Sequence, residues 1–114
     1  MEDIKIYHYS EPKEGKFGIR TEIKFDKDKY FVSVDELLTF NDGVRDITLC
    51  HYPMVSFEGR FHIHGHIHGN TKDIFWDTLK KMDKVLNASV EINNFEPVTF
   101  DRLLINNRKF KNDN

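Results

Sequence analysis

Histidines are concentrated in one short stretch of this 114-residue chain, which has six histidines in all. His62, His64, His66 and His68 occupy every second position, and His51 comes shortly before them. In an extended chain, residues two apart share a face, so we expect these four imidazoles to point the same way. Neutral imidazole is a good ligand for Zn, Fe, Ni, Cu and Mn. The spacing therefore predicts a transition-metal site.

Two other interpretations of the histidine stretch are a solvated surface tract and a buried cluster satisfied by hydrogen bonds. Stacked imidazoles repel one another when charged, and each needs a hydrogen-bond partner when buried and neutral. A shared metal ion removes both difficulties, and Gly65 and Gly69 let the backbone turn so that ring nitrogens converge. His62 is interpreted as an ordinary strand residue, and the isolated His8 as structural.

Four landmarks along the chain resemble those of the calcineurin-like metallophosphoesterases, particularly the small bacterial and phage members. Gly-His-Ile-His at residues 65–68 is similar to the family's G-H-x-H motif, and residues 49–54 (Leu-Cys-His-Tyr-Pro-Met) resemble the strand-end histidine motif before it. Residues 86–91 (Leu-Asn-Ala-Ser-Val-Glu) resemble its N-x-G/S-x-D/E strand, and residues 97–101 resemble the start of its closing helix. The landmarks occur in family order within residues 46–104.

This resemblance implies a metal-dependent phosphoesterase, a hydrolase that acts on phosphomonoesters or phosphodiesters. By that resemblance, His51 and His66 would ligate the second metal of a two-metal centre and His68 the first. His64 would be the catalytic residue of the set, lying behind the ligands or contacting phosphate. The implied cofactor is one or two divalent transition-metal ions (Mn, Zn, Ni or Fe), which clamp the phosphate and generate the attacking hydroxide.

The upstream half of the family's site is missing from this sequence. The family motifs D-x-H, G-D and G-N-H have no counterpart: Asp26-x-Asp28 lacks the histidine, and Asn41-Asp42-Gly43 is a turn without one. The resemblance therefore implies an enzyme that is incomplete and weakly active as an isolated chain. The alternatives are a non-catalytic metal-binding remnant, or one subunit of a split enzyme completed by an N-terminal-half chain or by a homo-oligomer.

The predicted strands and helices indicate an α/β fold, and the resemblance implies that it is the C-terminal half of a metallophosphoesterase β-sandwich preceded by a β-hairpin. We expect a single domain over residues 1–114, with an atypical β-rich segment at 1–45 and the metallophosphoesterase-like segment at 46–104. Alternating and continuous apolar runs predict strands, and capping residues predict helices. The predicted strands are residues 4–9, 17–25, 30–32, 47–51, 61–64 and 85–92. The predicted helices are residues 33–38, 73–82 and 100–104, with a turn at 41–43.

Composition limits the kinds of partner that the chain is expected to have. The formal net charge is −2, so no global basic field attracts nucleic acid or an anionic membrane. The expected partner is a phosphoester small molecule or a nucleotide. The single cysteine and the lack of a long apolar segment predict a cytoplasmic protein. Arg45 and Arg60 would contact phosphate or be solvated; Asn87 and Glu91 would orient ligand histidines or be ordinary strand residues.

Overall fold

The computed structural model describes residues 27–114, and contacts within the chain divide it into two compact units, residues 1–35 and 36–114. In the first unit, the short helix α1 spans Lys27–Tyr30 and is followed by irregular chain. The predicted strands at 4–9 and 17–25 lie outside the described residues. The predicted strand at 30–32 is wrong, because Tyr30 ends α1 and no strand follows it there.

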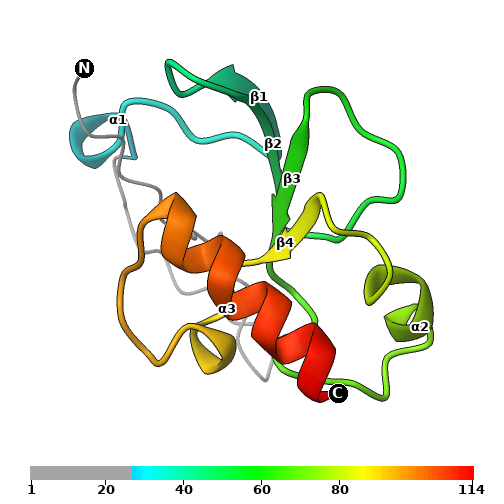
Figure 1. The fold of residues 1–114 in the computed structure, drawn as a ribbon. Coiled ribbons are helices and arrows are strands. Elements are labelled where there is room, and N and C mark those ends of the chain that lie inside the picture. The colour runs from blue at the N-terminus through cyan, green and yellow to red at the C-terminus, as the bar shows by residue number, and fades with distance from the viewer. Residues whose placement is uncertain (1–26) are drawn as a thin grey trace, which may run out of the picture. The chain divides into compact units, whose positions relative to one another are not determined.

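The second unit is built on a four-stranded mixed sheet (Figure 1). Its strands are β1 (Leu37–Asn41), β2 (Asp46–Cys50), β3 (Phe61–His64) and β4 (Val85–Asn87), in that spatial order. The β1 and β2 strands are antiparallel, whereas β3 runs parallel to both β2 and β4. The predicted α/β class is confirmed at this level. The predicted helix at 33–38 is wrong, because β1 begins at Leu37 and pairs with β2.

A tight turn joins β1 to β2, as the Asn-Asp-Gly sequence predicted. The Asn41 side chain accepts the Gly43 N–H at 2.7 Å, and the Asp42 carboxylate accepts the N–H groups of Val44 and Arg45 at 2.9 and 2.8 Å. Gly43 has a φ of 99°, which glycine adopts without steric cost. The bonds from Arg45 and Val44 keep the pKa of the Asp42 carboxyl below its ordinary value. This turn fixes the register of the hairpin.

The long helix α3 (Phe100–Asp113) covers the sheet and buries its main core (Figure 1). Thr99 caps the helix by accepting the Arg102 N–H at 3.2 Å. The helix extends well beyond the predicted 100–104. The buried residues of this core come from β2, β3, β4 and α3: Ile47, Phe61, Leu86 and Leu103.

Side chains near the end of α3 form hydrogen bonds with backbone groups in and just before β4, the outermost strand of the sheet. Asn107 is buried; its carbonyl accepts the Asn87 N–H at 2.7 Å, and its amide donates to the Asn87 carbonyl at 3.0 Å. The Lys111 ammonium donates to the carbonyls of Met82 and Val85 at 2.8 and 2.6 Å. Burial lowers the pKa of Lys111, against the opposing effect of Asp83. These bonds satisfy backbone groups at the edge of the sheet and explain why α3 continues past residue 104.

Two of the predicted elements are shorter than expected. Helix α2 spans only Trp76–Leu79 of the predicted 73–82. The β4 strand ends at Asn87 rather than Ile92, because the Asn87 side chain accepts the Ser89 N–H at 2.9 Å and turns the chain into the short 3₁₀ helix η1 (Val90–Ile92). Within residues 27–114, no helix combines the length and apolar character needed to span a membrane.

We predict that Asn107→Ala lowers the free energy of unfolding by about 1–3 kcal/mol, because it leaves the buried N–H of Asn87 without a partner and leaves Asn93 as the donor to the Asn87 carbonyl. Urea denaturation followed by circular dichroism measures this loss. Asn112→Ala, an exposed position on the same helix, is the matched control and should change stability by less than about 0.5 kcal/mol. Equal effects of the two substitutions would contradict this role of Asn107.

Candidate metal centre

The edge of the sheet where β2 and β3 end brings two of the predicted ligands together. These strands are parallel, so their carboxyl ends meet at the same edge, with Leu49 opposite Ile63. Beyond the strands, the Gly65 N–H donates to the His51 carbonyl at 2.9 Å. This bond brings His51 next to His66, with His51 Nε2 and His66 Nδ1 3.3 Å apart and the rings edge to face at a centroid distance of 5.1 Å.

The chain turns sharply as it leaves β3. The Ile67 N–H donates to the Gly65 carbonyl at 2.8 Å across His66, whose φ is 66°, and His68 has a φ of 51°. A turn closed over one residue of positive φ is the rare and strained form of γ-turn. Left-handed backbone costs a residue other than glycine roughly 1–2 kcal/mol. The strain falls on two of the predicted ligands.

This turn corrects the expectation that four imidazoles share one face. The extended chain ends at His64, so the alternation stops there. His62 and His64 are buried, whereas His66 and His68 are exposed beyond the turn. The buried Ile67 anchors the turn in a second apolar cluster with Leu79 and Val85.

A tyrosine that the sequence analysis did not single out lies beside the His51–His66 pair. The Tyr52 ring lies edge-on to both imidazoles, with centroid distances of 5.0 Å to His51 and 4.7 Å to His66. All three side chains are exposed to solvent. The sequence signal for Tyr52 was its position directly after His51. Residues that follow the end of a strand lie at the same edge of the sheet as the end of that strand. An ion in solution can therefore reach the two imidazoles.

His68 is held at both its backbone and its ring. Its Nδ1 lies 2.7 Å from a carboxylate oxygen of Glu91, and the Asn87 side chain donates to its backbone carbonyl at 2.7 Å. The Glu91 carboxylate accepts hydrogen bonds from the backbone N–H of Glu91 and from His68. These bonds keep the pKa of the Glu91 carboxyl below its ordinary value. With Nδ1 turned toward the carboxylate, Nε2 is the ring nitrogen left to face a ligand.

His62 is fully buried and serves the fold. Its Nδ1 lies 3.0 Å from the Thr48 carbonyl, and its Nε2 accepts the Met54 N–H at 3.0 Å. These bonds tie β3 to β2 and to the loop that follows β2. The interpretation of His62 as a strand residue is confirmed.

His64 lies behind the exposed edge, with 4% of its surface accessible. Its Nδ1 lies 2.9 Å from the Gly65 carbonyl. Burial lowers its pKa from 6.5 to about 4, so its ring is neutral at physiological pH. The predicted contact with phosphate would require an opening on this buried side.

The structure therefore brings two of the three predicted ligands together and leaves the third, His68, apart from them. His51 lies against His66, and His68 lies against Glu91. Among residues 27–114, no three His, Cys, Asp or Glu side chains form a group that could hold a metal ion. Glu91, which the sequence offered as an orienting residue or an ordinary strand residue, does contact a predicted ligand.

Comparisons of the chain with protein-family models, with curated proteins and with solved structures gave no match. The resemblance to metallophosphoesterases rests on the four sequence landmarks within residues 46–104, and the function that it implies is a proposal.

We predict that acid destabilises the fold through His64. Its pKa is about 4 in the folded chain and 6.5 in the unfolded chain, so between these values the unfolded chain binds a proton that the folded chain does not. The free energy of unfolding should fall by up to about 1.4 kcal/mol for each unit by which the pH is lowered from 6.5 to about 4. Urea melts of the wild type and of His64→Gln, recorded in chelator from pH 7 to pH 4, measure the difference. Parallel pH profiles for the two proteins would contradict the prediction.

Proposed function

We propose that this chain binds a divalent transition-metal ion through His51 and His66 and serves a metal-dependent phosphoesterase of the calcineurin-like type. In this proposal the sheet and α3 correspond to the C-terminal half of that family's β-sandwich. The upstream half of the site is supplied by a complementing chain or by a second copy. The substrate is a phosphoester small molecule or a nucleotide.

The separation of the two imidazole nitrogens carries the proposal. A tetrahedral Zn²⁺ ion with Zn–N bonds of about 2.0–2.1 Å places two ligand nitrogens about 3.3–3.4 Å apart. His51 Nε2 and His66 Nδ1 are 3.3 Å apart. The same separation also suits a direct hydrogen bond between the two rings in the absence of an ion. The distance thus fits two ligands of one ion, and the exposed rings leave its remaining positions open.

The contact between His68 and Glu91 supports a second metal-binding position in this proposal. A carboxylate that holds one ring nitrogen of a histidine fixes the tautomer and directs the other nitrogen to a metal. The 2.7 Å contact between Glu91 and His68 Nδ1 has this form. His64, neutral and buried, would lie behind the ligands rather than carry charge.

The strained turn also favours a binding role for His66. Strained backbone conformations persist where the surrounding structure enforces them, and they cluster at functional sites. His66 and His68 both have left-handed backbone, although glycine would adopt it without cost. A bound divalent ion would polarise a phosphoryl oxygen and lower the pKa of a bound water. In this proposal His51 and His66 would hold the ion, and Glu91 would orient His68.

A non-catalytic metal-binding module is the second candidate. Within the described part of the chain, two imidazoles meet and no third ligand joins them. Two protein ligands give a weaker and more open site than the three of a typical catalytic zinc centre. The two candidates differ in whether another chain adds the missing ligands and the group that protonates the leaving oxygen.

We predict that the purified chain binds about one transition-metal ion and that His51→Ala/His66→Ala abolishes binding. Elemental analysis after dialysis against Zn, Mn and Ni measures the stoichiometry. His68→Ala is the matched control and should retain the ion, because it leaves the facing pair in place. Wild-type stoichiometry in the double variant, or an absence of metal in the wild type, would contradict the proposed site.

We predict that the isolated chain hydrolyses bis-p-nitrophenyl phosphate weakly in Mn²⁺ or Ni²⁺, and that His66→Ala removes the residual turnover. Loss of general acid catalysis alone costs on the order of 10²- to 10⁴-fold in rate. Turnover that persists undiminished in His66→Ala would exclude the phosphoesterase proposal. Fast turnover by a monomer, abolished in the variant, would show that this chain carries a complete site.

A further inference from the structure

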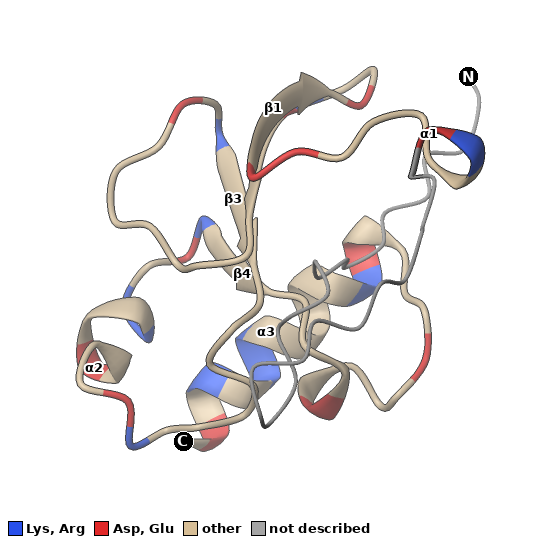
Figure 2. Ribbon diagram, turned by 180° about the vertical axis from the view of Figure 1, so that it is seen from behind, with Lys and Arg blue, Asp and Glu red and all other residues tan. Residues whose placement is uncertain are grey.

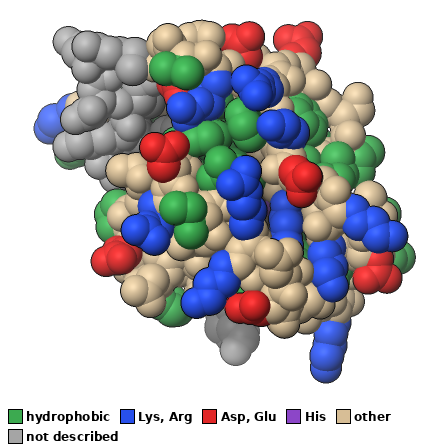
Figure 3. All heavy atoms as spheres, viewed as in Figure 1, with side chains coloured by type: hydrophobic (Ala, Val, Ile, Leu, Met, Phe, Trp, Pro, Cys, Tyr) green, Lys and Arg blue, Asp and Glu red, His purple; other side chains and the backbone are tan. Residues whose placement is uncertain are grey.

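One part of the second unit concentrates positive charge, although the whole chain has a formal charge of −2. Figure 3 shows Lys and Arg side chains gathered in the middle of the face that it displays, with Asp and Glu among and around them. Figure 2 shows basic positions where the chain enters β3 and β4, and along α3. We use the name cationic face for six residues that share aromatic rings or a pocket: Arg45, Arg60, Lys80, Lys81, Lys84 and Arg108.

Two packed phenylalanine rings hold half of this cationic face in place. Phe61 and Phe100 meet edge to face with a centroid distance of 5.0 Å. The Arg45 guanidinium lies 3.9 Å from the centre of the Phe100 ring, whereas Lys84 and Arg60 lie 4.7 and 5.7 Å from that of Phe61. Cations over aromatic faces are attracted by the ring electrons, which restricts their positions.

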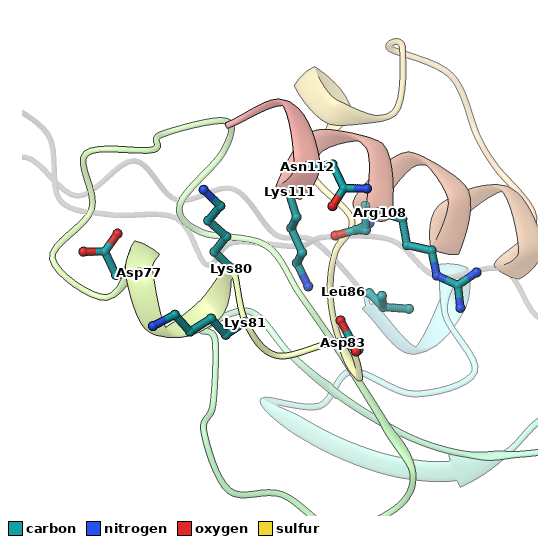
Figure 4. A pocket seen from close by; sticks show the side chains of 9 residues that line it. Asp77, Lys80, Lys81, Asp83, Leu86, Arg108, Lys111 and Asn112 are labelled. Carbon is teal, nitrogen blue, oxygen red and sulfur yellow. The ribbon is translucent and has the colours of Figure 1, made fainter.

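A pocket of about 380 Å³ holds the other half of the cationic face. Lys80, Lys81 and Arg108 line it, and their charged ends point in different directions (Figure 4). The Lys111 ammonium in the same pocket is engaged by two backbone carbonyls. Leu86 lines this pocket and packs in the core cluster that contains Phe61, so the two halves of the cationic face adjoin.

The separation of these cations determines which anion fits them. A single phosphate needs donors that converge on it, and the ends of Lys80, Lys81 and Arg108 do not converge. Cations spread over a surface instead match a polymer with repeated negative charges. Asp42 pairs with Arg45 at 3.6 Å, and Asp77 and Asp83 line the pocket, so the six cations remain in excess over these three carboxylates.

The surroundings of Arg45 indicate which kind of polyanion the cationic face would bind. The Arg45 guanidinium lies over the Phe100 ring, 3.9 Å from the centroid, and 21% of the side chain is exposed beside Asp42. Unpaired bases stack on guanidinium planes of this kind. An acidic polypeptide or an anionic lipid surface has no base to place there. We propose that the cationic face binds single-stranded nucleic acid, with phosphates on the Lys and Arg side chains and a base at Arg45. No histidine of the described residues is visible on the face in Figure 3, so this surface is separate from the proposed metal site.

Fluorescence anisotropy of a labelled single-stranded oligonucleotide, titrated with the full chain in chelator at several salt concentrations, tests this inference. Lys81→Gln/Lys84→Gln should weaken binding on the order of tenfold and reduce the slope of log K against log salt by about 1.4. Arg45→Lys keeps the charge and loses the planar stack, and it should also weaken binding. Lys72→Gln, an exposed lysine outside the cationic face, should leave binding unchanged.

Several results would overturn the inference. These are no binding at low salt, an equal loss in Lys72→Gln, or affinity for polyglutamate or phosphatidylserine vesicles that matches or exceeds that for the oligonucleotide. Unchanged affinity in Arg45→Lys would reject the stacked base and, with it, the preference for nucleic acid. Circular dichroism melts confirm that each variant is folded. Chelator in every titration keeps this test independent of the metal proposal.

Discussion

The hydrogen bond from the Gly65 N–H to the His51 carbonyl is the constraint on which the candidate site depends. It continues the parallel pairing of β2 and β3 by one rung after both strands have ended. Without it, His51 and His66 would belong to two independent loops. With it, the two ring nitrogens are 3.3 Å apart. The site is therefore a consequence of parallel strand pairing, and the buried ring of His62 reinforces that pairing from within the sheet.

The strained turn at His66 needs a rigid support, and polar side chains provide part of it. Asn107 satisfies the backbone of Asn87 at the edge of the sheet, and the Asn87 amide in turn holds the carbonyl of His68. A chain of hydrogen bonds thus runs from α3 through β4 to the turn. The buried Ile67 adds an apolar anchor beside it. Helix α3 consequently supports the candidate ligands as well as the core.

The sequence indicated this arrangement only in part, and the reasons are physical. A continuous apolar run identified β2, and Asn-Asp-Gly identified the turn at 41–43, because these signals are local. The strand β1 before that turn was predicted as a helix, because its pairing with β2 cannot be read from residues 33–38 alone. The length of α3 depends on bonds from Asn107 and Lys111 to a distant strand, which no local pattern reveals. Period-two spacing suggested four aligned imidazoles, but the positive φ of His66 ended the alternation. Likewise, net charge concealed the six Lys and Arg side chains that make up the cationic face.

Zinc X-ray absorption spectroscopy of the full chain with one equivalent of Zn²⁺ would show whether His51 and His66 share a metal ion. We expect two imidazole nitrogens at about 2.0–2.1 Å from the ion, with oxygen ligands completing the shell. His51→Ala and His66→Ala should each reduce the number of imidazoles to one. A shell of oxygen ligands alone, or an imidazole number unchanged in both variants, would show that His51 and His66 do not share a metal ion.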